Sequence, residues 1–154
     1  MPNSLKLLPS LRLLCMVPIA AAGLFAAGPA AAEELKMIEH ATTDAVTDTG
    51  AKGDSAGDIL TFANQIYDEA NAKELGYDNG WCIRTVPGKA WECFWTLSLA
   101  DGQVTVEGPF LDSGDSMLAV TGGTGKYAGV RGEMKLHARD EKGTEYDFVY
   151  NLMQ

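Results

Sequence analysis

AVTGGTGKYAGVRGEM, residues Ala119–Met134, is the stretch of this 154-residue sequence that decides the fold. Four glycines fall within Gly122–Gly129, between two apolar runs, which invites comparison with a phosphate-binding loop. A Walker A loop, however, has Ser or Thr after its Gly-Lys pair, and Tyr127 stands there instead. A dinucleotide-binding loop is followed directly by a helix, whereas Val130–Ala138 alternates apolar and polar residues with the period of a strand. The stretch therefore predicts a glycine-rich turn between antiparallel strands.

The same alternation recurs in short runs along most of the chain, and Gly, Pro or Asp turns separate the runs. We expect one short helix at Asp68–Leu75 and a polar loop at Ala41–Asp58. The strands are expected at Glu34–His40, Ile59–Tyr67, Trp81–Thr85, Trp91–Leu99, Gln103–Glu107, Met117–Thr121, Gly129–Arg139 and Glu145–Leu152. About eight short strands with turns of this kind predict an all-β fold, either an antiparallel barrel or a sandwich.

The first 32 residues have the pattern of a secretory signal peptide. Lys6 and Arg12 give a positive start, Leu13–Gly28 is apolar, and Ala30–Ala32 forms an Ala-x-Ala cleavage site. The apolar run is shorter than the roughly 20 residues that a membrane-spanning helix needs. We predict cleavage after Ala32, a single domain at residues 33–154, no membrane span, and a periplasmic or secreted location.

The charge of the predicted domain argues against polyanionic partners. All 21 Asp and Glu residues but only 10 of the 12 Lys and Arg residues follow Ala32, so the mature chain carries a net charge of −11. Such a chain is repelled by nucleic acids and by anionic membrane surfaces. His40 and His137 are isolated, and the aspartates of the polar loop lack the spacing of a calcium-binding loop. We predict no nucleic-acid partner, no metal site and no cofactor.

The two cysteines that remain after cleavage fit an oxidising compartment. Cys82 and Cys93 flank a Pro87-Gly88 turn, and they oppose each other in a symmetric hairpin about that turn. A four-residue loop would place them at a non-hydrogen-bonded pair, the favourable position for a disulfide. Either they form that disulfide, or they are two free thiols on one wall with one available to a ligand.

Four motifs follow one another along the predicted domain: GDSAGDILTFANQIYD (Gly53–Asp68), GWCIR (Gly80–Arg84), VEGPF (Val106–Phe110) and AVTGGTGKYAGVRGEMKL (Ala119–Leu136). In this order they resemble the allene oxide cyclase-like barrels and, more distantly, the plant dirigent proteins. The resemblance implies an eight-stranded antiparallel β-barrel around a hydrophobic cavity, often assembled as a trimer. We therefore expect this barrel, a hydrophobic small molecule as its partner, and a homotrimer or homodimer.

The resemblance also implies roles for single residues. Glu39 matches the acidic residue that promotes ring closure in the cyclases by stabilising developing positive charge. Asn64 matches an asparagine that helps to hold a water near the epoxide oxygen, and Cys82 matches a pocket cysteine. Two positions depart from the pattern, because Ala41 replaces a second water-binding asparagine and Asp48 replaces a proline. With Glu39 as the predicted catalytic residue, the predicted ligand-binding residues are Leu60, Phe62, Asn64, Cys82, Trp91 and Phe110.

Period-two alternation places Asn64 on the same face as Leu60, and Arg84 on the same face as Cys82. If these faces line the lumen, Asn64 and Arg84 are buried polar groups that need partners. Three arrangements are open: an ion pair between Glu39 and Arg84, convergence of the polar groups on a ligand, or an Arg84 side chain that reaches the rim.

Two classes of function remain, with a purely structural role as a third. In the first, the barrel is a cyclase or isomerase that folds a hydrophobic epoxide or polyene between apolar walls, with Glu39 as its electrostatic contact. In the second, a non-catalytic exported barrel carries an apolar molecule or guides radical coupling, as dirigent proteins do. The enzyme requires an ionised Glu39 that faces an open cavity, and the binding protein requires only the cavity. Bulky Trp91, Trp95 and Phe110 would fill the lumen in the structural alternative.

Overall fold

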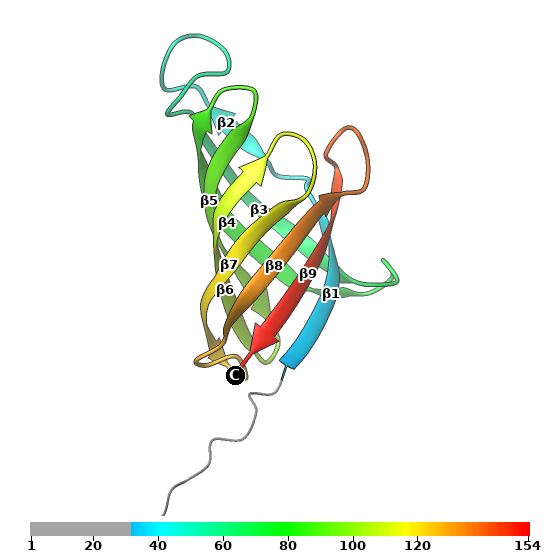
Figure 1. The fold of residues 1–154 in the computed structure, drawn as a ribbon. Coiled ribbons are helices and arrows are strands. Elements are labelled where there is room, and N and C mark those ends of the chain that lie inside the picture. The colour runs from blue at the N-terminus through cyan, green and yellow to red at the C-terminus, as the bar shows by residue number, and fades with distance from the viewer. Residues whose placement is uncertain (1–31) are drawn as a thin grey trace, which may run out of the picture.

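The computed structural model describes residues 32–154, which form a closed antiparallel β-barrel (Figure 1). Eight strands make the barrel, and a short strand, β2 (Ala45–Thr47), lies at its rim. The eight are β1 (Ala32–His40), β3 (Ile59–Asp68), β4 (Glu74–Val86), β5 (Ala90–Leu99), β6 (Gly102–Leu111), β7 (Ser116–Gly125), β8 (Arg131–Ala138) and β9 (Glu145–Met153). The predicted eight-stranded barrel is thus confirmed. The predicted signal peptide lies outside the described residues except for Ala32, the first residue of β1.

The barrel closes through β1. Strands β3 to β9 pair in sequence order, β9 pairs with β1, and β1 pairs with the second half of β3, from His40 against Gln65 to Met37 against Asp68. β2 pairs with the first half of the same edge of β3. Two different segments therefore cover one edge of β3, and the chain passes from one to the other at residues 41–44.

The predicted turn joins β7 to β8, but it is shorter than the glycine cluster, because Gly122, Gly123 and Gly125 belong to β7 and only residues 126–130 form the connection. Gly125 and Gly129 have φ values of 60° and 80°, a conformation that side chains with a Cβ atom rarely adopt. The backbone N–H of Tyr127 donates to the carbonyl of Thr124, and the buried Tyr127 side chain packs into the core. The turn therefore serves folding, by closing one end of the hydrophobic core.

The predicted helix at Asp68–Leu75 is wrong. β3 continues through Asp68, whose carboxylate accepts hydrogen bonds from the backbone N–H groups of Ala72 and Lys73, and β4 begins at Glu74. Asn71 adopts a left-handed φ of 55° in the turn. The segment has favourable helix formers, but the pairing of β3 with β4 outweighs this weak local preference. As a result, β4 starts seven residues earlier than predicted.

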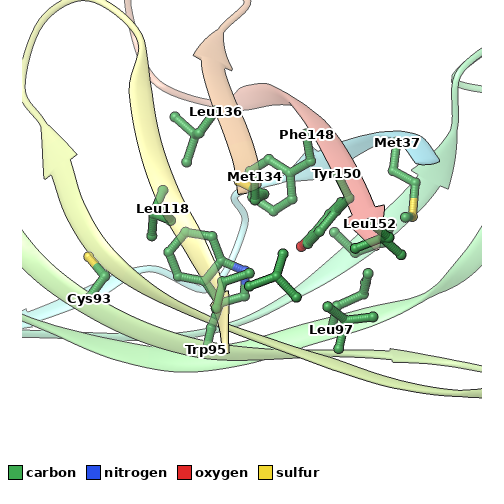
Figure 2. Close-up of a cluster of buried hydrophobic side chains, with 14 of the residues drawn as sticks. Met37, Cys93, Trp95, Leu97, Leu118, Met134, Leu136, Phe148, Tyr150 and Leu152 are labelled. Carbon is green, nitrogen blue, oxygen red and sulfur yellow. The ribbon is translucent and has the colours of Figure 1, made fainter. Parts of the chain in front are cut away.

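Inward-facing side chains fill most of the barrel (Figure 2). The ring of Trp95 stacks against Phe148 with 5.8 Å between centroids and meets Phe62 edge-on at 6.0 Å. The rest of the core is continuous with this aromatic layer and combines aliphatic side chains with further aromatic ones, such as Tyr150, whose ring meets Phe148 edge-on at 6.3 Å. Its labelled members in Figure 2 are Met37, Cys93, Trp95, Leu97, Leu118, Met134, Leu136, Phe148, Tyr150 and Leu152. A cavity lies at the end of the barrel above the aromatic layer.

Candidate functional site

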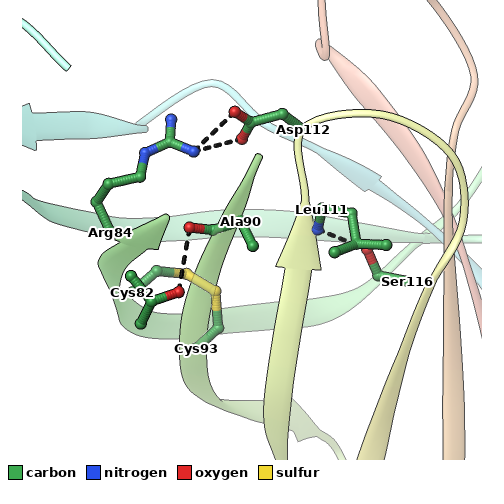
Figure 3. The surroundings of a disulfide bond; sticks show 8 residues. Cys82, Arg84, Ala90, Cys93, Leu111, Asp112 and Ser116 are labelled. Carbon is green, nitrogen blue, oxygen red and sulfur yellow. Dashed lines mark hydrogen bonds and ion pairs between the residues drawn. A yellow bond between two sulfur atoms is a disulfide. The ribbon is translucent and has the colours of Figure 1, made fainter. Parts of the chain in front are cut away.

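A disulfide joins Cys82 to Cys93 on the wall of the barrel (Figure 3). The two cysteines are directly opposed in the β4–β5 ladder, and Arg84 opposes Trp91, as the hairpin geometry predicted. In the turn, the Lys89 N–H donates to the Val86 carbonyl, but the register shifts after Arg84, so that Val86 pairs with Ala90. The free-thiol alternative therefore does not apply to this structure.

A cavity of about 30 Å³ lies at the end of the barrel where β1 and β4 finish and β5 and β9 begin. This volume holds one or two waters. Five of the predicted site residues line it, namely Glu39, Leu60, Phe62, Cys82 and Phe110. The remaining lining residues are Asp44, Cys93, Trp95, Leu136, Tyr146 and Phe148.

Two aromatic side chains stand where the cavity meets the rim. Phe110 of β6 and Tyr146 of β9 touch edge to face, with 5.9 Å between their ring centroids. Both are only partly buried. Burial, followed by the nearby carboxyl groups of Glu39 and Asp44, raises the pKa of Tyr146 to about 12. Its hydroxyl is therefore a neutral hydrogen-bonding group at physiological pH.

Arg84 and Trp91 lie outside the cavity. The guanidinium carbon of Arg84 is 3.9 Å from the centre of the Trp91 ring, which it covers. Its Nε atom is 2.7 Å from Asp54 Oδ1, and its Nη1 atom donates to both oxygens of Asp112 at 2.6 and 2.8 Å (Figure 3). Arg84 thus reaches the rim, which was one of the three arrangements. The Glu39–Arg84 ion pair is not formed, and Trp91 is not a lining residue of this cavity.

Asn64 binds protein groups with all of its amide atoms. Its Nδ2 atom donates to Glu39 Oε1 and to Asp44 Oδ1, both at 2.8 Å. Its Oδ1 atom accepts from the backbone N–H groups of Thr42 and Thr43 at 3.1 and 3.0 Å and from the Thr43 hydroxyl at 2.9 Å. Asn64 is therefore not a wall of the cavity. Asn64 fixes the position of Glu39, and Glu39 lines the cavity.

Asp78 on β4 is a second buried acid that sequence reasoning missed. It is fully buried, whereas Glu39 is 5% exposed, and its Oδ1 atom accepts a long hydrogen bond of 3.4 Å from the Asn64 backbone N–H. Within residues 32–154, its Oδ2 atom has no hydrogen-bond partner. The expected strand began at Trp81 and left Asp78 outside. Extended backwards, the alternation of Arg84, Cys82 and Gly80 would have placed Asp78 on the inner face.

Burial changes the protonation of both acids. Loss of solvent raises the pKa of Asp78 to about 7. Desolvation first, and then the Asp78 charge, raise the pKa of Glu39 well above its usual range, although the Asn64 hydrogen bond opposes this. Burial therefore favours the neutral form of Glu39 and disfavours the ionised form that the enzyme hypothesis requires.

The described residues offer no obvious place for a metal. Within residues 32–154, no group of three or more His, Cys, Asp or Glu side chains could hold a metal ion. The same residues include no helix long and apolar enough to cross a membrane. The cavity lining combines two acids, Glu39 and Asp44, which are both hydrogen-bonded to Asn64, with an apolar and aromatic wall.

Solved structures with this fold come from several kinds of protein. They include a pyocyanin demethylase (24% identity, TM-score 0.68, covering 78% of this chain and 99% of that chain). A pterocarpan synthase dirigent protein has 11% identity and a TM-score of 0.70, over 90% of this chain and 97% of that chain. An exo-specific intermolecular Diels–Alderase has 15% identity and a TM-score of 0.69, over 82% of this chain and all of the other. At these identities the likeness shows the fold alone.

The sequence itself gives the family. The allene oxide cyclase family profile matches residues 33–139, from β1 to the end of β8 and well over half of the chain. The matched region contains Glu39, Asn64, Asp78 and the disulfide. This protein belongs to the allene oxide cyclase family.

Proposed function

We propose that this protein is an exported cyclase or isomerase that acts on a hydrophobic small molecule in the barrel lumen, with Glu39 as the catalytic residue. One observation carries the proposal: a buried carboxyl group, held by Asn64, lines a cavity whose other walls are mostly apolar and aromatic. Apolar walls select one folded conformation of a flexible substrate. In surroundings with little water, one acid acts more strongly on developing charge than it would in solvent.

The size of the cavity sets a condition on this function. About 30 Å³ is too small for an organic substrate. Phe110 and Tyr146 lie at the rim and are partly exposed. Their rings contact each other edge to face. We propose that these two side chains move apart when the substrate enters. Leu60, Phe62 and the Cys82–Cys93 disulfide then form the walls that contact it.

Export belongs to the same proposal. The disulfide fits an oxidising compartment, and the N-terminal pattern fits a signal peptide. Cleavage after Ala32 would leave β1 intact from Glu33, which pairs with Leu152 of β9. The intact mass of protein isolated from its native host tests this, because a species that retains residues 1–32 contradicts cleavage.

A homotrimer or homodimer remains a prediction. The outer face of β4 exposes Tyr77, Trp81 and Ile83, and such an apolar strip offers a surface for a second copy of the barrel. Sedimentation velocity of the purified domain measures the oligomeric state directly, and a monomer at all concentrations would remove the prediction.

The second candidate is a barrel that binds or guides an apolar molecule without catalysing its reaction. The raised pKa of Glu39 favours it, since burial disfavours the carboxylate and a neutral acid is a weaker electrostatic partner. The fold supports both candidates, because it is shared by a Diels–Alderase and by a dirigent protein.

Small molecules that co-purify with the exported protein separate the two candidates. Each is identified by mass spectrometry and then incubated with the native protein, with Glu39→Gln and with the control Glu92→Gln, whose side chain is on the exposed face of β5. An enzyme converts the compound in the native and control proteins and at least about ten-fold more slowly in Glu39→Gln, equivalent to roughly 1.4 kcal/mol of barrier. Release of the unchanged compound by all three proteins means binding only. Equal turnover by all three means that Glu39 is not the catalytic residue.

A further inference from the structure

Two carboxyl groups from different strands meet inside the barrel. β3 lies between β1 and β4, and its register places Ile66 opposite Glu39 and Asn64 opposite Asp78. Both acidic side chains are buried, and Asn64 binds both: its Nδ2 atom donates to Glu39 Oε1 at 2.8 Å and its backbone N–H donates to Asp78 Oδ1 at 3.4 Å. Each carboxyl group also shifts the pKa of the other. Glu39 is on the cavity side of the pair, and Asp78 does not line the cavity. One acid therefore faces the ligand and the other supports it from behind.

The surroundings of the pair do not balance two negative charges. Within residues 32–154, no Lys, Arg or His side chain forms an ion pair with Glu39 or Asp78. The nearest candidate on the inner face of β4, Arg84, is bound to Asp54 and Asp112 at the rim. Two buried carboxylates in contact repel each other strongly. We therefore expect the pair to retain at least one proton.

We propose that Glu39 and Asp78 act as one proton-sharing pair, in which Glu39 gives its proton to an oxygen atom of the ligand and Asp78 keeps the second proton. The Asp78 O–H group then donates a hydrogen bond to the new Glu39 carboxylate. Asp78 is a positioning residue, because it acts on the ligand only through Glu39. The inference rests on the proposed function of the lumen and names its chemistry, which is acid catalysis on a hydrophobic molecule that carries an epoxide or carbonyl oxygen.

The proton balance of this step is closed. The O–H bond of Glu39 breaks, its electron pair stays on the carboxylate, and a new O–H bond forms on the ligand oxygen. The ligand gains one positive charge and the acid pair one negative charge, so the two form an ion pair in the cavity. At the end of an isomerisation the same proton returns from the ligand to Glu39, and no external oxidant or reductant is needed.

Other groups that face the pair do not compete for this proton. Asn64 donates to Glu39 from β3, and Asp44 reaches the same amide from the loop after β1. On β9, burial and the nearby carboxyl groups raise the pKa of Tyr146 and of Tyr150, so both remain protonated. As the pH rises, the pair loses its first proton when Asp78 ionises, with a pKa of about 7. The doubly protonated form is the proton donor, so turnover should fall as the pH rises through about 7.

Carboxyl ¹³C NMR titration of the folded protein tests the pair without any substrate. In the native protein we expect two linked titrations, one near pH 7 and one well above the normal carboxyl range. In Asp78→Asn, the Glu39 titration should move down by more than one pH unit, because a neighbouring negative charge has been removed. The control Glu107→Gln, on the exposed outer face of β6, should leave both titrations unchanged.

Two outcomes overturn the pair: ordinary titration of Glu39 in the native protein, or an unchanged Glu39 titration in Asp78→Asn. If Asp78→Asn does not fold, infrared spectra of the native protein decide instead. A protonated carboxyl band that persists at pH 8 and disappears in Glu39→Gln supports the pair, and its absence from the native protein contradicts it. Failure of the proposed function is a separate result, since linked titrations with no turnover of any ligand would keep the pair and remove the enzyme.

Discussion

Gly80 of β4 lies directly opposite Trp95 of β5, and the Trp95 side chain begins where a side chain at residue 80 would be. A Cβ atom at residue 80 would collide with the backbone carbonyl of Phe94 and with the Cβ of Trp95. The absence of a side chain at this position therefore lets the indole lie across the barrel. There it forms the floor of the cavity, between Phe62 and Phe148.

Gly80→Ala should destabilise the barrel, because the new methyl group displaces either Trp95 or the β4–β5 ladder. Overpacking of this kind costs about 1–3 kcal/mol of unfolding free energy. Urea unfolding measures it, with Gly122→Ala as the control, since a Cβ at Gly122 makes only an ordinary contact with the Thr105 hydroxyl. Equal stability of the two variants would mean that the indole is not fixed by residue 80.

The disulfide should contribute substantially to stability. Cys82 and Cys93 are 11 residues apart, and closing a loop of this size in the unfolded chain is worth roughly 3 kcal/mol. Replacing both cysteines with serine should lower the unfolding free energy by about this amount in guanidinium titrations. Addition of a reductant should produce the same loss in the native protein and none in the double variant. A native protein insensitive to reductant in its unfolding would show that the bond contributes little.

The rim of the cavity should control access to the lumen. Phe110→Arg places a charge beside Tyr146 and the apolar walls, and desolvating that charge opposes entry of an apolar molecule. Binding of an apolar fluorophore should weaken at least about ten-fold, the equivalent of roughly 1.4 kcal/mol, with an unchanged far-ultraviolet circular dichroism spectrum. Leu111→Arg, the next residue and an exposed one, is the matched control. Unaltered binding in Phe110→Arg would locate the dye outside the barrel.

The buried acids should make stability depend on pH in an unusual direction. Asp78 titrates near its ordinary value of 3.8 when unfolded and at about 7 when folded. Because folding raises this pKa, the folded state binds more protons in between, and its contribution to stability is complete below about 3.8 and is lost as the pH rises through about 7. The difference in unfolding free energy between pH 5 and pH 8 should therefore shrink in Asp78→Asn.

Comparison of the variant with the native protein is essential for this measurement. Other acids, such as Asp58 and the exposed Asp115, have lowered pKa values, from backbone hydrogen bonds in the first case and from Lys135 and His137 in the second. They contribute stability that is lost as the pH falls, which is the opposite sign. Their contribution is the same in both proteins and cancels in the difference. Identical pH dependence of the two proteins would assign the titration to groups other than Asp78.

Local sequence patterns predicted much of the fold. The turn between β7 and β8, most of the strands and the Cys82–Cys93 pairing depend on neighbours in sequence, and these were confirmed, although Gly122–Gly125 extend β7 instead of forming the turn. The helix at Asp68–Leu75 failed because strand pairing, a non-local interaction, outweighed helix propensity. Because of the same error, the predicted strand began at Trp81 instead of Glu74, and Asp78 was not predicted to lie on the inner face of β4.

The partners of the polar lumen residues could not be predicted for a related reason. Arg84 binds Asp54 and Asp112, which come from two loops on either side of it in sequence. Asn64 reaches Glu39 only because β1 closes the barrel against β3. Alternation shows which face a side chain occupies, but contacts across a closed barrel depend on how the ends of the sheet meet.

The change of partner along β3 has a consequence for engineering. The wall has a seam at residues 41–44, and Asn64 fastens it by accepting hydrogen bonds from Thr42 and Thr43. The same amide also binds Glu39, so the Asn64 side chain both holds the barrel wall together and orients the Glu39 carboxyl group. A substitution at the seam would loosen both at once. New ligand specificities are therefore more accessible through substitutions of Phe110 and Tyr146, which leave the barrel wall at residues 41–44 intact.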